Sequence, residues 1–179
     1  MVNQPGNPLQ RRMRARLRDI AQAYDFQTFT LPNFAAWLAA QRGRALNFVP
    51  FALPAPLFGA WLQGADQDFI FYAQDAAPLH QAHIQLHELA HILCEHPTLT
   101  PGTPEGNAFI ALLTLQTPDA DAPGVALRLA YTEEQEREAE TLAALIQQQV
   151  LAQAGRERLV SAPSSNGTLD AYLRSLQLT

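Results

Sequence analysis

Two histidines spaced four residues apart offer the clearest chemistry in this sequence. His87 and His91 begin and end the run His-Glu-Leu-Ala-His at 87–91. On an α-helix, residues at this spacing lie on one face about 6 Å apart, so both imidazoles can bind a single zinc ion. Glu88 lies beside that face, where its carboxylate could accept a proton from a metal-activated water. The run therefore predicts the helix of a zinc-dependent peptidase.

The residues around this motif predict a buried helix. Apolar side chains recur through it at Ile84, Leu86, Leu89, Ala90, Ile92 and Leu93. We expect the helix to begin near Asp75 as its N-cap, with Pro78 in the first turn. It should end at about Glu95, because Pro97 cannot continue it.

The same helix predicts one stripe of titratable groups. At about 100° per residue, a single arc of roughly 80° contains His80, His83, His87, His91 and Cys94. His80 and His83 are either packing residues at the rim or groups that assist the reaction. Cys94 is either a small buried apolar residue or an additional zinc ligand that would inhibit the site.

A catalytic zinc site requires a third protein ligand, and a later helix supplies candidates. This helix should begin at Thr132, which forms a capping-box pattern with Gln135, and end at about Ala154. Its candidate carboxylates are Glu133, Glu134, Glu136, Glu138 and Glu140. Glu136 borders the apolar stripe Ala139, Leu142, Ala143, Ile146 and Val150, so we expect it to point inward and complete the metal site.

The remaining patterns predict an α+β fold. Helical periodicity covers 10–24, 32–42 and 107–116, and strand-like segments cover 46–51, 57–63 and 68–72. We expect a small antiparallel sheet packed on the zincin-like active-site helix, with additional N- and C-terminal helices. The edge of such a sheet could pair with an extended substrate chain.

Length and composition favour one domain. The chain has 179 residues, of which 47% are hydrophobic, enough for one sizeable core. We expect a single metallopeptidase domain over 1–179, with a loose tail over 1–9 and a linker over 161–168 that leads to a short C-terminal helix.

The single cysteine excludes an intramolecular disulfide and favours a reducing cytoplasm. The most apolar segment, 45–62, is interrupted by prolines, which argues against a membrane span.

The charge distribution leaves two interpretations of the first helix. The net charge of −5 argues against a general nucleic-acid binder. The first helix nevertheless carries a local basic group, namely Arg11, Arg12, Arg14, Arg16 and Arg18. These side chains either form a solvated face or contact an anionic partner, such as a nucleic-acid signal or an acidic protein surface.

The two motifs together resemble the ImmA/IrrE metallopeptidases. The sequence His-Glu-Leu-Ala-His at 87–91 is followed by Glu-Arg-Glu-Ala-Glu at 136–140, similar to the family's second motif, Glu-x-Glu-Ala-Asn/Asp. The resemblance covers about 45–150 and implies Zn²⁺ held by His87, His91 and Glu136. It also implies that Glu140 hydrogen-bonds a ligand histidine. Tyr131 or His83 is then a candidate for stabilising the oxyanion.

The resemblance also implies a biological role. Members of this family are commonly encoded beside a helix-turn-helix repressor, which they cleave to switch on a prophage, stress or defence operon. The expected function is thus a cytoplasmic zinc endopeptidase in transcription regulation. One alternative is a zinc-binding partner that holds the repressor without cutting it. The other is a helical interaction module whose histidines coincide by chance.

Overall fold

Along the described chain, the three strands follow the helices α1 and α2 and precede α3, α4 and α6. The structure is a computed structural model that describes residues 7–115 and 131–161. It begins with α1 (Pro8–Ala23), the 3₁₀ turn η1 (Phe26–Thr28) and α2 (Leu31–Arg42). The strands are β1 (Ala45–Phe51), β2 (Gly59–Gln63) and β3 (Gln67–Ala73). The later helices are α3 (Pro78–Leu93), α4 (Pro104–Leu115) and α6 (Glu133–Ser161).

The sheet is mixed, with strand order β1-β3-β2. β2 and β3 form an antiparallel hairpin, whereas β1 pairs with β3 in parallel. The α+β class with a small sheet is confirmed. The expectation of a wholly antiparallel sheet is corrected, because β3 lies between the two earlier strands and runs in the same direction as β1. β2 is consequently an edge strand.

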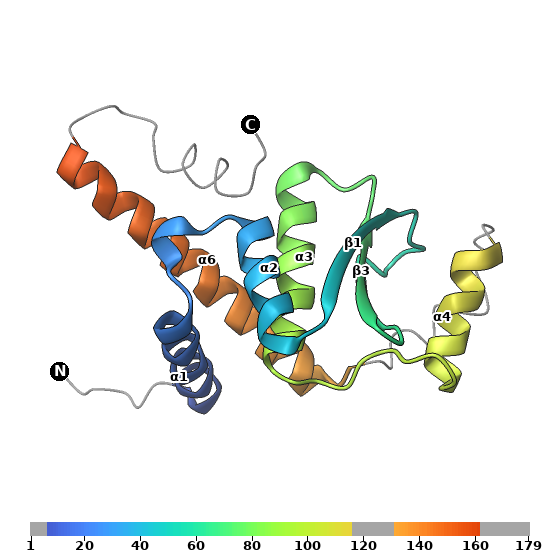
Figure 1. The fold of residues 1–179 in the computed structure, drawn as a ribbon. Helices are drawn as coiled ribbons and strands as arrows, with labels where there is room; N and C mark the ends of the chain where they lie inside the picture. The colour runs from blue at the N-terminus through green and yellow to red at the C-terminus, as the bar shows by residue number, and fades with distance from the viewer. Residues whose placement is uncertain (1–6, 116–130, 162–179) are drawn as a thin grey trace.

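Alternate side chains of the sheet pack against different helices. Ile70 belongs to the apolar cluster that joins the sheet to α1, α2, α3 and α6. Its neighbour Phe71 belongs to a second cluster, in which Phe109 of α4 packs against the opposite face. Figure 1 shows α3 on one side of the strands and α4 on the other. This two-sided packing fixes the sheet beside the histidine helix.

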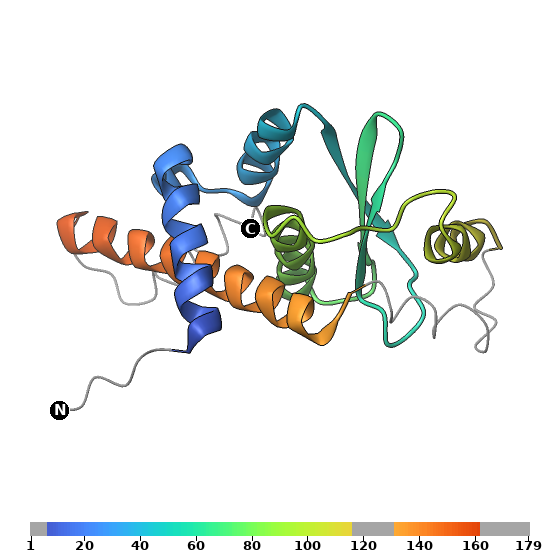
Figure 2. The same ribbon diagram turned by 90° about the horizontal axis from the view of Figure 1, so that it is seen from below.

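The long helix α6 crosses α1 and α3, as the view from below shows (Figure 2). The apolar stripe predicted for this helix is confirmed, because all of its members are buried: Ala139, Leu142, Ala143, Ile146 and Val150. They join Met13 of α1 and Leu89 of α3 in the main core. Burial of this stripe sets which side of α6 faces α3.

The ends of the helices agree only in part with the sequence predictions. The capping box is confirmed: the Gln135 amide donates to Thr132 Oγ1 at 3.3 Å, and the Thr132 amide donates to Gln135 Oε1 at 2.8 Å. Asp75 is not the N-cap of α3; that position is Ala77, which makes no side-chain cap. Pro78 starts the helix because its φ is fixed and it has no N–H to satisfy.

The terminal segments differ from expectation as far as they are described. Pro8 and Leu9 belong to α1 and not to a loose tail, because the side chain of Asn7 accepts the Leu9 amide and starts the helix there. Ser161, the first residue of the predicted linker, is the last residue of α6, so the structure contradicts the linker there. The rest of the linker and the predicted C-terminal helix lie outside the described residues. Within 7–115 and 131–161, no helix combines the length and apolarity that crossing a membrane requires.

Candidate metal centre

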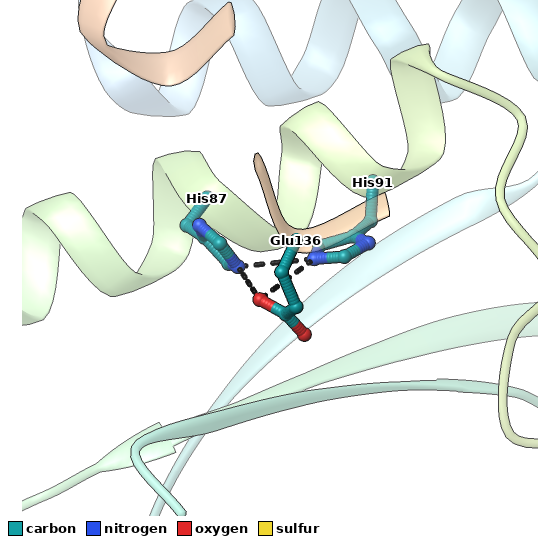
Figure 3. A group of neighbouring side chains, drawn as sticks. All are labelled: His87, His91 and Glu136. Carbon is teal, nitrogen blue, oxygen red and sulfur yellow. Dashed lines mark hydrogen bonds and ion pairs between the residues drawn. The ribbon is translucent and has the colours of Figure 1, made fainter. Parts of the chain in front are cut away.

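The packing of α6 against α3 brings three predicted ligands together. His87 and His91 project from α3, and Glu136 projects from the first turns of α6 (Figure 3). Glu136 Oε2 lies 3.2 Å from His87 Nε2 and 3.8 Å from His91 Nε2. The two histidine Nε2 atoms are 3.0 Å apart. All three donor atoms therefore lie within 4.8 Å of one another, close enough to share one ion.

The three groups differ in burial and in charge. His91 is fully buried, whereas 49% of the Glu136 side chain is exposed, so the group opens to solvent on the α6 side. Hydrogen bonds from His87 and His91 lower the pKa of Glu136 to about 2. Burial lowers the pKa of His91 to about 4. An ionised carboxylate beside a neutral imidazole is the form in which these groups bind a metal.

Glu88 occupies an apolar position next to the three ligands. Only 4% of the residue is exposed, and Oε2 has no hydrogen-bond partner among the described residues. Burial raises the pKa of Glu88 to about 7, opposed by the neighbouring His87. A carboxylate with this pKa can both accept and return a proton near neutral pH. Because Oε2 makes no hydrogen bond to the described residues, it can accept one from a reacting group.

A cavity of about 320 Å³ lies in front of these side chains. His87, Glu88 and Glu136 line it from the two helices. The start of β2 and the preceding loop also line it, with Phe58, Gly59, Ala60 and Trp61. His80 and His83 line the same cavity further along α3. The cavity is thus lined both by polar side chains of the two helices and by the apolar start of β2.

Glu140 lies where the sequence placed it, near a nitrogen of a ligand histidine. Its Oε2 is 3.5 Å from Nδ1 of His87 and 3.2 Å from Nε2 of His83. His83 is also 3.1 Å from the amide of Gln147 through its other nitrogen. These contacts leave His83 at the rim, held by α6. Glu140 can therefore orient His87 while Nε2 of that ring faces the metal position.

Tyr131 packs directly on one of the proposed ligand histidines. Its ring stacks on that of His91, with 3.6 Å between ring centroids, and it lines the cavity. The hydroxyl is buried without a hydrogen-bond partner among the described residues. Burial, with the nearby carboxylate of Glu88, raises the Tyr131 pKa, so the hydroxyl stays protonated. It is available to donate a hydrogen bond into the cavity.

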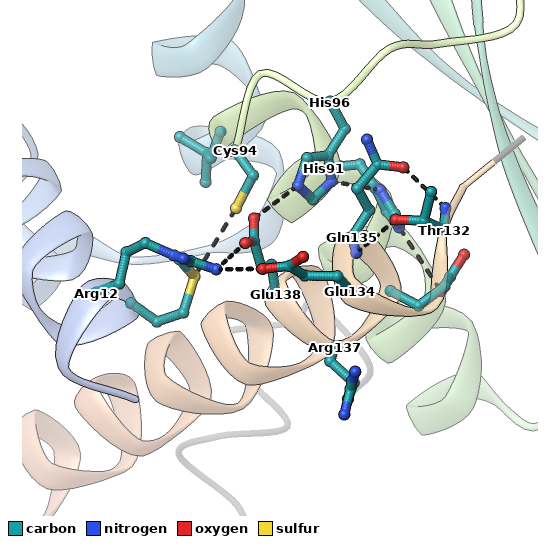
Figure 4. A network of polar contacts seen from close by, with 12 residues as sticks. Arg12, His91, Cys94, His96, Thr132, Glu134, Gln135, Arg137 and Glu138 are labelled. Carbon is teal, nitrogen blue, oxygen red and sulfur yellow. Dashed lines mark hydrogen bonds and ion pairs between the residues drawn. The ribbon is translucent and has the colours of Figure 1, made fainter. Parts of the chain in front are cut away.

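Cys94 does not join the group of His87, His91 and Glu136. Its sulfur is 4.0 Å from the sulfur of Met13 and lies within 4.8 Å of ligand atoms of His96 and Glu138. Burial raises the Cys94 pKa to about 11, which keeps the thiol neutral. Cys94 is the C-cap of α3, beyond His91, and its side chain lies near Glu138 of α6 and Met13 of α1 (Figure 4).

His96, for which the sequence predicted no role, and Glu138, one of the candidate carboxylates for the third ligand, both contact the site through His91. Nδ1 of His96 is 2.9 Å from Nδ1 of His91, and Nε2 of His96 is 3.0 Å from Glu138 Oε2. Glu138 in turn pairs with Arg12 of α1 (Figure 4). The signal in the sequence was the fifth histidine itself, only five residues beyond His91. Its direction depends on the turn at Glu95, which has a positive φ of 59°.

The arginines of α1 divide into two groups. Arg12 pairs with Glu134 and Glu138, and Arg16 donates to the carbonyl of Leu93 at the end of α3. These two residues fasten α1 to the site helices. The remaining three, Arg11, Arg14 and Arg18, are exposed.

The donor set fits a zinc ion. Two imidazole nitrogens and one carboxylate are ligands that zinc binds readily, and the cavity leaves a fourth position open. Glu88, whose buried Oε2 has no hydrogen-bond partner among the described residues, lines the same cavity. Comparisons with protein-family models, with curated proteins and with solved structures found no match to this chain.

Proposed function

We propose that this protein is a zinc-dependent endopeptidase of the ImmA/IrrE type. The observation that supports this most directly is the convergence of His87, His91 and Glu136 at the wall of a cavity that also contains the buried carboxyl of Glu88. A metal bound by these three residues would supply Lewis-acid activation of a water molecule and of the scissile carbonyl. The resemblance of the two motifs to that family also supports the proposal.

Glu88 would act as the general base. Its raised pKa lets it take a proton from the attacking water and deliver it to the departing amine. Tyr131 would donate its hydroxyl proton as a hydrogen bond to the developing oxyanion, because this residue lines the cavity and its buried hydroxyl has no hydrogen-bond partner among the described residues. Glu140 would orient His87 through Nδ1.

The substrate would bind as an extended chain along β2. Gly59 and Ala60 lie on this edge strand and line the cavity. The outer edge of β2 is covered further along by Leu99, which accepts a hydrogen bond from the Gln63 amide and bridges Leu62. Main-chain pairing at the uncovered end would place a peptide bond beside Glu88. By the family resemblance, the substrate is a helix-turn-helix repressor cut to derepress a prophage, stress or defence operon in the cytoplasm.

The first experiment measures bound metal and cleavage in the same preparations. Wild type should contain about one zinc per chain, and Glu136→Ala should lose it. Glu88→Gln should keep the zinc while cleavage of the candidate repressor falls by about 10²–10⁴-fold. Absence of zinc in wild type under zinc-replete conditions would end the proposal. Repressor control that survives in Glu88→Gln would favour the alternative of a zinc-binding partner that does not cut.

The exposed arginines of α1 provide a separate test of a nucleic-acid signal. Among the residues that the structure describes, no side chain pairs with Arg11, Arg14 or Arg18 as Glu138 pairs with Arg12. Binding of single-stranded DNA should fall with added salt and with replacement of these three residues by glutamine. Equal binding by wild type and variant would leave α1 as a solvated, structural helix.

A further inference from the structure

The contacts behind His91 form a continuous chain of polar groups. It runs from Nδ1 of His91 to Nδ1 of His96 at 2.9 Å, and from Nε2 of His96 to Glu138 at 3.0 Å. Glu138 then pairs with Arg12. His91 and His96 are both buried, and 17% of the Glu138 side chain is exposed. The chain connects α3, the turn after it, α6 and α1, as Figure 4 shows.

The positions of the protons follow from the geometry. A contact between two imidazole nitrogens at 2.9 Å holds a single proton, so one ring donates and the other accepts. A neutral His91 that offers the lone pair of Nε2 to a metal must carry its proton on Nδ1. His91 is then the donor and His96 the acceptor. His96 must consequently carry its own proton on Nε2, where the Glu138 carboxylate accepts it.

We propose that His96 is a positioning residue for the metal site: it accepts a hydrogen bond from His91 Nδ1–H, donates one to Glu138, and so holds the His91 Nε2 lone pair toward the metal. The inference rests on the proposed zinc site and adds residues to it. Arg12 keeps Glu138 as an acceptor by pairing with its other oxygen. The two ligand histidines are thus oriented by different carboxylates of α6, His87 by Glu140 and His91 through His96 by Glu138.

The same proton arrangement also decides whether Cys94, His96 and Glu138 could bind a second metal ion. Their ligand atoms also lie within 4.8 Å of one another, which by distance alone would suit a second metal. A cation on Nε2 of His96 would move the His96 proton to Nδ1, and His91 would become the acceptor. The His91 proton would then occupy Nε2 and block the first site. The two groups therefore exclude each other, and the zinc-loaded protein holds one ion per chain.

The first test determines which imidazole nitrogens carry protons in the wild-type protein. In the zinc-loaded form, ¹⁵N-resolved NMR of the imidazole rings should show His91 protonated on Nδ1 and His96 protonated on Nε2. Zinc titration followed by desalting should leave about one equivalent. A His96 ring protonated on Nδ1, or a second retained equivalent that is lost in Cys94→Ser, would overturn the inference.

The second test measures zinc affinity by competition with a chelator. His96→Phe should weaken zinc binding by about 10–100-fold, the usual effect of removing a group that orients a ligand histidine. Glu138→Gln should weaken it in the same direction while keeping the shape of the side chain. Glu134→Gln is the matched control, because Glu134 also contacts Arg12 but does not contact His96.

The outcomes separate this inference from the proposed function. If no form of the protein binds zinc, both this inference and the proposed function fail. If wild type binds zinc and Glu138→Gln binds it as tightly as Glu134→Gln does, the inference fails and the peptidase proposal stands. Melting curves of the zinc-free variants show whether a loss of affinity reflects loss of folding. Should His96→Phe fail to fold, the isosteric Glu138→Gln and the wild-type NMR spectrum still decide the question.

Discussion

At the scale of single residues, Gly59 controls the space beside the proposed general base. A Cβ added at Gly59 would lie 2.6 Å from Glu88 Oε1 and 2.7 Å from a methyl carbon of Ile84. Real Cβ atoms do not approach so closely, so a substitution must displace one of these side chains. The end of the Glu88 side chain is the more flexible of the two. Glycine at this position of β2 therefore lets Glu88 occupy the cavity wall.

Gly59→Ala should lower peptidase activity without removing the metal. Misplacement of a catalytic group by about 1 Å can cost about 10²-fold in rate. We expect kcat/KM to fall by about 10–100-fold, while the zinc content stays at about one per chain because no ligand contacts Gly59. Activity equal to wild type would show that Glu88 does not need its present position. Loss of zinc would show that the substitution disturbs α3 as a whole.

The residues of the candidate site were predictable to the extent that helical spacing determines them. His87 and His91 follow from a spacing of four, and Glu136 follows from its place beside a buried stripe. His96 and Glu138 did not follow, because their meeting depends on the turn at Glu95 and on the crossing of α6 over α3. For Cys94 the sequence left two alternatives, and helical projection could not choose between them; in the structure Cys94 packs against the main core, as the first alternative expects.

At the scale of elements, the start of α6 determines where Glu136 stands. The side chains of Thr132 and Gln135 each accept a hydrogen bond from the other's backbone amide. Thr132 lies four residues before Glu136, the proposed ligand. Thr132→Ala should lower the free energy of unfolding by about 1 kcal/mol. It should also weaken zinc binding, because the first turn would be less ordered.

A matched control lies further along the same helix. The hydroxyl of Thr141 donates to the carbonyl of Arg137, four residues earlier, and caps nothing. Thr141→Ala should leave stability and zinc affinity unchanged or slightly improved, because alanine favours the helix interior. Chemical denaturation and chelator competition measure both quantities. Equal effects of the two substitutions would contradict a special role for the capping box.

The end of α2 is joined to the sheet by a buried carboxylate. Asp68 of β3 is fully buried and pairs with Arg42 and Arg44, with 2.9 Å between Arg44 Nη2 and Asp68 Oδ1. Removing one partner of such a pair leaves buried charge uncompensated. Asp68→Ala should therefore destabilise the protein by about 3 kcal/mol, measured by denaturant unfolding. Asp66→Ala, in the exposed turn two residues earlier, should change stability by less than about 0.5 kcal/mol.

The fold was predictable in its elements and not in how the strands pair. Alternating and helical periodicities located the strands and most helix ends to within a few residues. The exception is the end of α6, which continues through Gly155 to Ser161 and not, as predicted, to about Ala154. A parallel β1–β3 pair could not be inferred, because nothing local in 45–73 distinguishes a meander from a hairpin that returns beside the first strand. Likewise, the capping box could be predicted from the four residues 132–135. The start of α3 was predicted wrongly, because Pro78 and not a cap at Asp75 begins the helix.

At the scale of the whole molecule, the proposed metal joins parts of the chain that are far apart in sequence. His87 and His91 come from α3, and Glu136 comes from α6 some 45 residues later. Through His96, Glu138 and Arg12 the same site also contacts α1. An ion that binds the folded arrangement and not the unfolded chain stabilises the fold by mass action. Metal removal should thus loosen the docking of α1 and α6 as well as stop the reaction.

This coupling predicts a concentration-dependent melting temperature. Free zinc at about 100 times its Kd should add about 2.7 kcal/mol to the free energy of unfolding. For a domain of this size that raises the Tm by about 5–10 °C relative to protein held in a chelator. Glu136→Ala should abolish the rise, whereas Glu134→Ala, on the exposed side of the same turn, should retain it. A rise that persists in Glu136→Ala would place the stabilising ion elsewhere, and an unchanged wild-type Tm would show that α3 and α6 dock without it.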